Sequence, residues 1–526
     1  MMLGDLFSGK PYIVDYDRKL NTIFNLIADD YVDTVTVGDL VENAIPKILT
    51  ELDPHTTYIP AKDLTAVNNE LEGSFSGVGI SFAIIEDTIR VTQVIPGGPS
   101  ERAGLMAGDR IVTIDDSTFV GPGLNQIDVR DKHLKGKKNS AVKLGIKRDR
   151  TDGLLTFDVI RGDVPVKSVD AAYMVNDETG YIKVNKFGRT TYDEFLNSLI
   201  LLKSKGASKF IIDLRGNAGG YMETAILMAN EFLPQNRLIV FTKGREKRND
   251  SEVWSDGNGS FQEDEIVVLL DEFSASASEI FAGAIQDNDR GLIIGRRSFG
   301  KGLVQRQIVL PDSSAIRMTI SRYYTPSGRC IQKDYKHGED KYNQELLDRY
   351  SHGELYSQDS IRIDTTQIFT TAHGRKVYGG GGIIPDIFVP NDTSGITSYY
   401  MKVANAGLIQ KFAYKFADAN RAQLTATKDY KRLMKALPSD QALLNDFVYY
   451  ASRNGVPARW YYINISSKLL TTQLKAVIGQ YILGDEAFFP MLNEDDNNID
   501  AAIAAFKEHK AEFPIYPQDE DGKKSH

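Results

Sequence analysis

The chain has 526 residues, 42% of them hydrophobic and 10% aromatic, which excludes disorder as its main state and suggests about three or four domains. Its 62 lysines and arginines against 71 aspartates and glutamates give a formal charge of −9, which argues against nucleic acid as a partner, because phosphate binding needs a basic face. The single cysteine, Cys330, excludes an intrachain disulfide and a zinc site built on several cysteines.

The first part of the chain has helical periodicity. Apolar residues recur at helical spacing from Leu20 to Ala28, and a second helix is predicted over 37–52 with Thr36 as its N-cap. The loop LDPHTTYIP follows at 52–60, and a third helical stretch runs to about Glu72. No secretory signal is expected at the start, no apolar run is long enough for a transmembrane helix, and the end reads as a polar tail.

The sequence texture changes three times after this helical part. Residues 73–162 contain short β-rich runs between glycine turns, such as GVGISFAII and DRIVTID, and predict a small β-rich module. Residues 180–330 alternate strands such as FIIDLR and IVVLLDE with helices, which predicts βαβ units. A glycine cluster at 379–382 precedes IIPDIFVP, and apolar stripes at helical spacing dominate from about residue 396 onward.

Two motifs contain candidate catalytic groups. In the run FSASASEI, three serines lie between a predicted strand and a helix from about Ser278, where one serine could act as a nucleophile or the serines could cap the helix. In the run SFGKG, Lys301 lies between two glycines, where it could be a buried neutral base or an ordinary surface lysine. The flanking residues do not fit the phosphate-binding P-loop pattern.

Two further motifs could bind anions through backbone amides. DLRGNAGG ends in a glycine pair directly after a strand, and it is either an anion-binding turn or a plain tight turn. Gly77-Val78-Gly79-Ile80 could hold the terminal carboxylate of a peptide that adds to a sheet as an extra strand, or it could be an ordinary strand start. None of the seven histidines has a paired metal-binding spacing, so the histidines predict no metal site.

Together, these motifs resemble the carboxyl-terminal processing peptidases, which are PDZ-containing Ser-Lys serine proteases of the tail-specific type. LDPHTTYIP, GVGI, DLRGNAGG, FSASASEIFAGAIQD, RRSFGKGLVQ and GGGGIIPDIFVP occur in the family order, and the similarity spans roughly residues 15–395. The resemblance implies that Ser276 is the nucleophile and Lys301 the base. It also implies that Gln305, one helical turn after the lysine, orients that base.

The resemblance extends to the other site residues and to the fold. It implies an oxyanion hole formed by the amide of Ala277 and by Gly219 or Gly220, with no metal and no cofactor. The expected fold is multidomain α+β: an N-terminal helical region at 1–73, a PDZ-like domain at 74–162, a crotonase-like α/β protease core at 163–395, and a helical C-terminal domain at 396–526.

The expected function is a serine endopeptidase that binds protein or peptide substrates by their C-termini and cleaves near them through an acyl-enzyme. The resemblance also implies a homo-oligomer formed through terminal helices and a location in the bacterial periplasm or cell envelope, and it leaves any adaptor unknown. Two alternatives remain. One is an inert PDZ-containing peptide-binding scaffold, which the intact Ser276, Lys301 and Gln305 argue against. The other is a crotonase-like acyl-CoA enzyme, which would need neither the Ser-Lys pair nor a PDZ domain.

Overall fold

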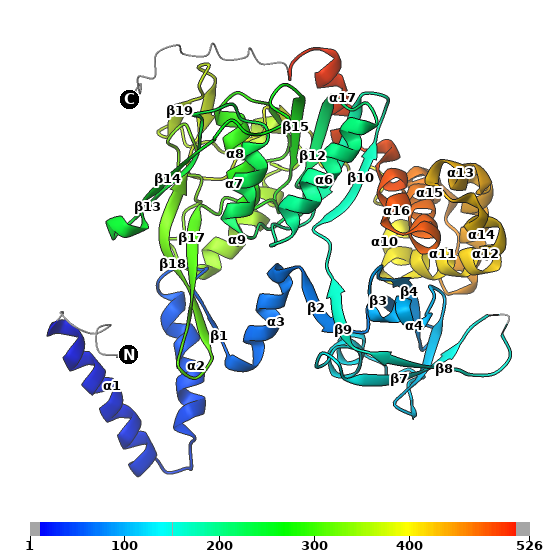
Figure 1. Ribbon diagram of the computed structural model, residues 1–526, viewed down its shortest axis with the longest axis horizontal. Helices are drawn as coiled ribbons and strands as arrows, with labels where there is room; N and C mark the ends of the chain where they lie inside the picture. Colours follow the sequence, from blue (N-terminus) through cyan, green and yellow to red (C-terminus); the bar gives the residue numbers. More distant parts are fainter. Residues whose placement is uncertain (1–10, 150, 512–526) are drawn as a thin grey trace. The chain divides into compact units, whose positions relative to one another are not determined.

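The computed structural model describes residues 11–149 and 151–511 (Figure 1). The chain divides into two compact units, one made of residues 1–65, 304–320 and 334–345 and the other of the remainder. The expectations of no signal sequence at the very start and of a polar tail at 516–526 lie outside the described residues. Within the described ranges, no helix has both the length and the apolar character needed to cross a membrane.

The first unit combines the predicted N-terminal helices with a short antiparallel sheet. Helices α1 (Pro11–Asp30) and α2 (Val37–Thr50) confirm the helical periodicity. Thr36 occupies the N-cap position of α2, but its side chain makes no capping hydrogen bond. Strand β1 (Thr57–Ile59) pairs with the start of β18 (Ala315–Tyr324), which also pairs with β17 (Leu303–Val309). The loop LDPHTTYIP therefore leads into the edge of this sheet.

The β-rich module predicted over 73–162 is a sheet with its own apolar core. Its strands pair in the order β3 (Ile80–Ile85), β4 (Thr88–Val94), β5 (Arg110–Ile114), β7 (Ala141–Lys147) and β8 (Leu155–Ile160). Strand β2 (Ser74–Gly77) follows helix α3 (Ala61–Glu72) and begins the module, and β9 (Gly162–Pro165) ends it. The two strands form an antiparallel pair. Alternate side chains of β4, β5 and β7 point inward, among them Ile89, Val91, Ile111, Val142 and Leu144. The short strand β6 (Ser117–Thr118) pairs with β5, and the module also contains helix α4 (Pro99–Ala103), the short helix α5 (Gln126–Asp128) and the π-helix η2 (Val129–Leu134).

The predicted βαβ units form one largely parallel sheet. Strands β11 (Thr179–Val184), β12 (Lys209–Asp213), β15 (Glu265–Leu270) and β16 (Leu292–Gly295) pair in parallel in that order. The antiparallel β10 (Val169–Met174) and the short parallel β21 (Ile387–Phe388) flank them. The connecting segments contain α6 (Thr191–Ser204), α7 (Met222–Asn230) and α8 (Ala277–Asp287). Strands β12, β15 and β16 are apolar runs because helices cover both faces of such a sheet.

Smaller elements extend this core. Strand β13 (Leu238–Gly244) pairs with β14 (Ser251–Trp254) and with the last residues of β18. A hairpin of β19 (Ile368–Thr370) and β20 (Lys376–Tyr378) lies between α9 (Glu339–Ser351) and the glycine cluster.

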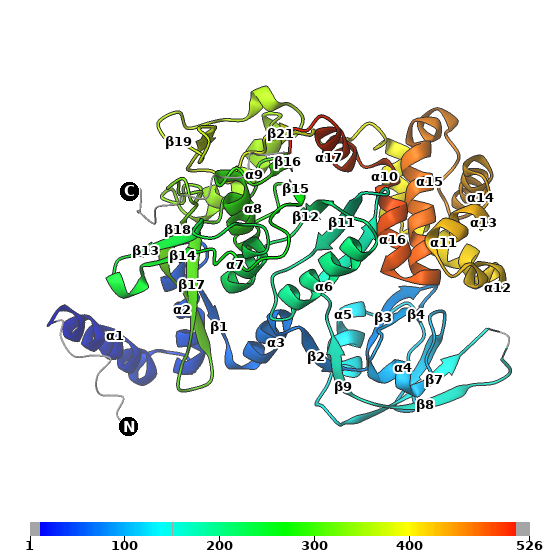
Figure 2. The ribbon, with the colours of Figure 1, turned by 45° about the horizontal axis from the view of Figure 1, so that its top comes forward.

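The predicted C-terminal helices are present, and they pack in two places. Figure 2 shows α11, α15 and α16 side by side, and they contribute to one apolar cluster that includes Leu408, Phe412, Leu470 and Leu474. Ile85 of β3 belongs to the same cluster, and Arg90 of β4 forms an ion pair with Asp418. The helices of this region are α10 (Ser398–Asn405), α11 (Leu408–Ala419), α12 (Arg421–Leu424), α13 (Tyr430–Ala436), α14 (Asp440–Arg453), α15 (Trp460–Leu483) and α16 (Asp485–Leu492).

The last helix, α17 (Asn497–Lys507), packs on the parallel sheet. Its apolar residues Ile499 and Phe506 lie in one cluster with Ile211, Val267 and Ile294 of the sheet. Figure 1 shows α17 next to the ends of β12 and β15. The C-terminal segment thus covers part of the core that contains the predicted catalytic residues.

Candidate active site

Ser276 lies at a sharp turn between β15 and α8. It occupies the N-cap of α8 with φ 57° and ψ −114°, a positive φ that a non-glycine residue rarely adopts. Its side chain is half-buried, whereas Ser274 and Ser278 on either side are fully buried. A strained strand-to-helix turn of this kind presents a nucleophilic hydroxyl beside the free amides of the helix start.

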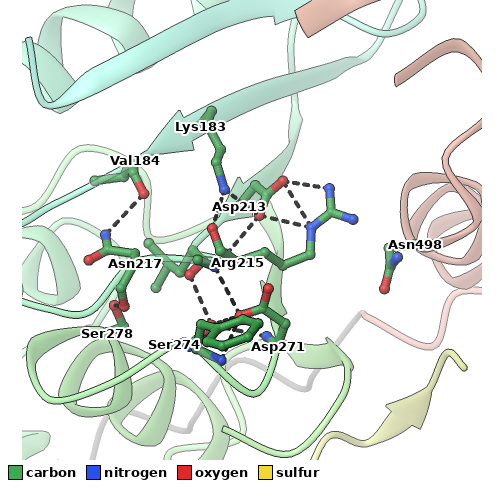
Figure 3. A network of polar contacts seen from close by, with 12 residues as sticks. Lys183, Val184, Asp213, Arg215, Asn217, Asp271, Ser274, Ser278 and Asn498 are labelled. Carbon is green, nitrogen blue, oxygen red and sulfur yellow. Dashed lines mark hydrogen bonds and ion pairs between the residues drawn. The ribbon is translucent and has the colours of Figure 1, made fainter. Parts of the chain in front are cut away.

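The two flanking serines hold a neighbouring loop. The hydroxyl of Ser274 donates to the carbonyl of Leu214 at 2.9 Å, and the hydroxyl of Ser278 donates to the carbonyl of Asn217 at 2.9 Å (Figure 3). The backbone N–H of Ala275 also donates to the carbonyl of Asn217, at 3.0 Å. The three serines therefore have different roles, and the outer two fix the DLRGNAGG loop against the turn that contains Ser276.

Glu279 ties the serine turn to the lysine loop. One carboxylate oxygen, Oε2, accepts the backbone N–H groups of Ser276 and Lys301, both at 2.8 Å. The other, Oε1, accepts the Ser298 hydroxyl at 2.5 Å and the Gly300 N–H at 2.7 Å. Burial raises the pKa of Glu279 above its ordinary 4.5, and these hydrogen bonds only partly offset that effect. One fully buried carboxylate thus fixes the backbones of both predicted catalytic residues.

Tyr323 makes a second link between the same two residues. Its hydroxyl lies 2.7 Å from the carbonyl oxygen of Lys301 and 3.1 Å from that of Ser276. Its own N–H donates to the carbonyl of Gly302. Glu279 binds the N–H groups of Ser276 and Lys301 and Tyr323 contacts their carbonyls, so the relative position of the two backbones is fixed on both sides.

The lysine loop is also held from the outside. The buried guanidinium of Arg349 donates to the carbonyls of Ser298 at 2.7 Å and Phe299 at 3.2 Å. The glycine cluster packs on the same segment: a Cβ on Gly382, whose φ is +86°, would lie 2.6 Å from the carbonyl oxygen of Ser298. This close approach explains a glycine in GGGGIIPDIF, because any side chain there would displace the lysine loop.

The DLRGNAGG loop brings a glycine pair to the serine turn. A Cβ on Gly219 would lie 2.8 Å from Cβ of Ser276 and 2.9 Å from N of Ala277, so the loop passes directly against the nucleophile turn. The Gly219 N–H donates to Oδ1 of Asn217 at 2.8 Å. In contrast, the N–H groups of Gly220 and Ala277 have no hydrogen-bond acceptor among the described residues. These two amides are the free donors next to Ser276.

The local structure around Gln305 differs from the expectation. The sequence predicted it one helical turn after Lys301, but residues 303–309 form strand β17, so the helical geometry is wrong. Gln305 belongs to the first unit, where its side-chain amide donates to the carbonyl of His55 in the loop LDPHTTYIP. Asp53 shapes that loop by accepting the N–H groups of His55 and Thr56, both at 2.8 Å. The loop therefore positions Gln305, a relationship that no local motif predicted.

A buried charge network supports the DLRGNAGG loop (Figure 3). Asp213, at the end of β12, accepts the hydroxyl of Tyr181 at 2.6 Å and forms ion pairs with Lys183 and Arg215. Burial raises the pKa of Asp213, but the charges of Arg215 and Lys183 outweigh it and hold the pKa below its ordinary 3.8. Asp213 is therefore charged in the folded protein.

The PDZ-like module has a groove of about 270 Å³ beside β3. Its lining includes Val78, Gly79 and Ile80, whereas Gly77 is not among the lining residues. The other lining residues are Phe75, Ser81, Phe82, Gln126, Arg130, Leu134 and Lys135. The groove is thus lined mainly by apolar residues, and its lining also includes the cationic side chains of Arg130 and Lys135.

The backbone at the end of this groove is oriented for an anion. The carbonyl of Val78 accepts the N–H of Ser100 at 2.8 Å, and the carbonyl of Gly79 accepts the N–H of Ile95 at 3.0 Å. In a trans peptide the N–H points opposite to the carbonyl, so the amides of Gly79 and Ile80 point away from these partners. Gly79 has φ +80°, which lets successive amides converge on one anion.

Three family models match the regions just described. A model for peptidase family S41 matches residues 178–340, a PDZ domain model matches residues 76–160, and a family of unknown function matches residues 399–484. The first match covers the strands β11, β12, β15 and β16 and the turn that contains Ser276, and the second covers the module that contains the groove. The chain thus combines a PDZ domain and a protease domain, of mixed α/β structure, with a helical C-terminal region.

Relatives of known name agree with these matches. The chain is 35% identical over 320 residues to a carboxy-terminal-processing protease of Bartonella bacilliformis. The matched segment covers 60% of this chain and 72% of that protein. It is 29% identical over 349 residues to the carboxy-terminal processing protease CtpB of Bacillus subtilis, covering 66% and 71% respectively. The solved photosystem II D1 C-terminal processing protease is 25% identical, covers 70% of this chain and 92% of that one, and has a TM-score of 0.36. The chain belongs to the carboxy-terminal processing proteases of family S41 and is a serine-type peptidase.

Sequence reasoning missed several residues that shape the site. Glu279 had a usable signal, because a glutamate three residues after a serine at a helix start is the capping-box pattern. Tyr323 had none, because it is 22 residues from Lys301 and meets it only through the tertiary fold. Arg349 likewise lies 51 residues from the carbonyl that it binds.

Proposed function

We propose that this protein is an endopeptidase that captures free C-termini through its PDZ domain and cleaves near them with Ser276 and Lys301. The observation that supports this best is the backbone arrangement of the two residues. Ser276 adopts a strained positive φ at a strand-to-helix turn, and its N–H shares one buried carboxylate oxygen with the N–H of Lys301. Strain of this kind persists only where the surrounding structure enforces it.

The proposed reaction proceeds through an acyl-enzyme. Lys301 accepts the Ser276 hydroxyl proton as the serine oxygen bonds to the substrate carbonyl carbon, which gives a tetrahedral oxyanion. Collapse of this intermediate breaks the C–N bond, and the Lys301 ammonium gives its proton to the leaving amine. Water then attacks the serine ester, with Lys301 again accepting a proton, and breaking the ester C–O bond returns that proton to Ser276 and releases the new C-terminus.

The oxyanion is assigned to the N–H groups of Ala277 and Gly220. Both amides lack an acceptor among the described residues, and Gly219 packs directly against Ser276 and Ala277. Of the two glycines that the sequence left open, Gly220 is preferred, because the Gly219 N–H is already bonded to Asn217. Each such donor contributes about 2.7–4 kcal/mol to transition-state stabilisation.

Lys301 can act as a base only when it is neutral, and an ordinary lysine, with a pKa of about 10.4, is charged at neutral pH. Enclosure of the site with bound substrate would disfavour the charged form. We assign Gln305 to orienting the amine of Lys301. The support is the family resemblance.

Substrate recruitment is assigned to the groove of the PDZ domain. The amides of Gly79 and Ile80, together with Val78, would hold the terminal carboxylate, and the peptide would pair with β3 as an added strand. Gly77, which the sequence included in this site, would act only as the end of β2.

The remaining proposals concern architecture and setting. We assign a crotonase-like fold to the core at 163–395, with the other regions at 1–73, 74–162 and 396–526. Copies of the chain would associate through terminal helices, since α1 exposes Leu20 and Leu26. The enzyme would act in the bacterial periplasm or envelope on protein or peptide C-termini.

The test compares the wild type with Ser276→Ala, Lys301→Arg and Gln305→Ala on peptides with free and amidated C-termini. Wild type should cleave the free-acid peptides preferentially, with kcat/KM rising with pH along a limb below the ordinary lysine pKa. Ser276→Ala should be inactive because it removes the nucleophilic hydroxyl. Lys301→Arg should be inactive because a guanidinium stays protonated and cannot accept the serine proton. Gln305→Ala should retain more activity than either.

Two results would contradict the proposal. Substantial turnover by Lys301→Arg would exclude the Ser-Lys dyad, and equal cleavage of free and amidated peptides would exclude carboxylate capture. A fluorophosphonate label on Ser276 of the wild type separates an active protease from an inert scaffold.

A further inference from the structure

Asp496, just before α17, uses its two carboxylate oxygens for different purposes. Oδ1 accepts the backbone N–H of Asn498 at 2.8 Å and so caps α17. Oδ2 lies 2.8 Å from Nη2 of Arg215 in the DLRGNAGG loop. The same carboxylate therefore joins the C-terminal helix to the loop that contains the candidate oxyanion glycines.

The guanidinium of Arg215 is shared between two acids. Its Nη2 is 2.6 Å from Oδ2 of Asp213 and 2.8 Å from Oδ2 of Asp496. Lys183 adds a second cation to this buried group, through Asp213 and the carbonyl of Arg215. The four side chains are 1–18% exposed. Two cations then face two anions, and loss of Asp496 would leave an uncompensated positive charge that is costly where water is scarce.

The backbone after Arg215 leads directly to the serine turn. The Gly216 N–H donates to Asp271 at 2.9 Å, the Asn217 amide donates to the carbonyl of Val184 at 2.9 Å, and Asn217 Oδ1 accepts the Gly219 N–H (Figure 3). Figure 3 also places Arg215 between this loop and the segment that contains Asn498. Gly216 and Asn217 thus connect Arg215 to the glycine pair along the chain and through the Asn217–Gly219 hydrogen bond.

The position of Asp496 is itself fixed by the core. Ile499 and Phe506 of α17 pack with Ile211, Val267 and Ile294 of the parallel sheet. Residues 485–511 lie beyond the helical family match, which ends at residue 484. The segment is thus anchored to the protease sheet on one side and to the loop on the other.

We propose that Asp496 is a positioning residue for the oxyanion loop, so that the C-terminal segment is part of the catalytic machinery of the protease domain. This inference rests on the proposed function. Asp496 contacts no reacting atom. It holds Arg215, and through Arg215 it sets the position of the loop that presents Gly220 beside Ala277.

The experiment uses the full chain with Asp496→Asn, which keeps a capping oxygen and removes the charge that faces Arg215. The matched control is Asp495→Asn, which makes the same change one residue away, at a side chain that is 39% exposed and paired with Lys468. Active sites are counted with a fluorophosphonate, and kcat and KM are measured on a free-acid peptide. The affinity for a peptide boronate, whose tetrahedral adduct occupies the oxyanion hole, is measured alongside.

Asp496→Asn should lower kcat by about 10- to 100-fold, because a small misplacement of catalytic groups costs up to about 100-fold. KM should stay within about twofold, since the PDZ groove is untouched, and boronate affinity should fall in proportion to kcat. Asp495→Asn should match the wild type, and Asp496→Glu, which restores the charge, should recover part of the kcat.

Three results would overturn the inference. Equal kcat per active site in Asp496→Asn and Asp495→Asn would show that Asp496 has no role in positioning. If Asp496→Asn fails to fold, Asp496→Ser is measured instead, and failure of both to fold would assign the residue to stability alone. A wild type that cleaves no peptide would contradict the proposed function itself, and this inference with it.

Discussion

Glu279, in the helix after Ser276, and Asp213, at the end of β12, are two buried carboxylates that are stabilised in different ways. Glu279 accepts four hydrogen bonds from uncharged groups, namely two hydrogen bonds at each oxygen. Asp213 is held by the cations Arg215 and Lys183 as well as by the hydroxyl of Tyr181. Burial accordingly leaves the pKa of Glu279 above its ordinary value, whereas the nearby cations hold the pKa of Asp213 below its own.

The two carboxylates therefore stabilise the protein in different ways, Glu279 through the direction of its hydrogen bonds and Asp213 through its charge. Glu279 fixes the relative position of two backbones, so its contribution is directional and depends on acceptor oxygens. Asp213 neutralises buried cations at the end of β12, so its contribution depends on its charge. Replacing each acid by its amide, which keeps the shape and removes the charge, should therefore affect different properties.

Asp213→Asn should cause the largest loss of stability. It leaves Arg215 and Lys183 with only Asp496 as a buried counter-charge, and breaking a buried pair in this way costs about 3–5 kcal/mol. The free energy of unfolding from urea titrations checks this, with Asp163→Asn as the control, because Asp163 is an exposed partner of Lys138 and should change stability by less than about 0.5 kcal/mol. An equal effect of the two substitutions would mean that the buried network does not stabilise the core.

Glu279→Gln should reduce activity more than stability. The new amide group presents hydrogens to two of the four donors, so either the N–H groups of Ser276 and Lys301 or the N–H of Gly300 must lose an acceptor. We expect kcat to fall by about 100-fold, as for other losses of catalytic alignment, with the melting temperature lowered less than in Asp213→Asn. Full activity in Glu279→Gln would show that the shared carboxylate does not position the dyad.

The two substitutions should respond to pH with opposite signs. The lowered pKa of Asp213 means that its contribution is present above about pH 3.8 and is lost as the pH falls further, so the stability difference from Asp213→Asn should shrink in acid. The raised pKa of Glu279 means that its ionised form costs stability at neutral pH. Protonation below the raised value relieves that cost, so the difference from Glu279→Gln should grow between pH 7 and about pH 4.5.

Unfolding free energies of the wild type and both variants at pH 7, 5 and 3 measure these slopes. Parallel slopes for the two variants would mean that neutral and charged partners hold the two carboxylates in the same way. The present distinction between Glu279 and Asp213 would then be wrong.

Most of the helices and strands could be predicted from local sequence patterns. The strands FIIDL and IVVLL and the helix of SEIFAGAIQD appear where alternation of apolar runs and helical stripes predicted them. Helix α8 begins at Ala277, one residue before the predicted start at about Ser278. Errors arose where a short segment lacked periodicity, as at Gln305, which lies in β17 and not one helical turn beyond Lys301.

The sequence by itself determined the order of the motifs and the parallel β-α alternation, because these depend on periodicity and turn residues, whereas Ser276, Lys301 and Gly79 became candidates through the resemblance to the carboxyl-terminal processing peptidases. Only the tertiary structure decided that Glu279 and Tyr323 bridge the serine and lysine backbones, and that Asn217 takes the Gly219 amide and leaves that of Gly220 free. It also brought Asp496 to Arg215, across hundreds of residues of chain. The physical reason is that a buried polar group must find its partner wherever the fold places one, and no local pattern encodes that choice.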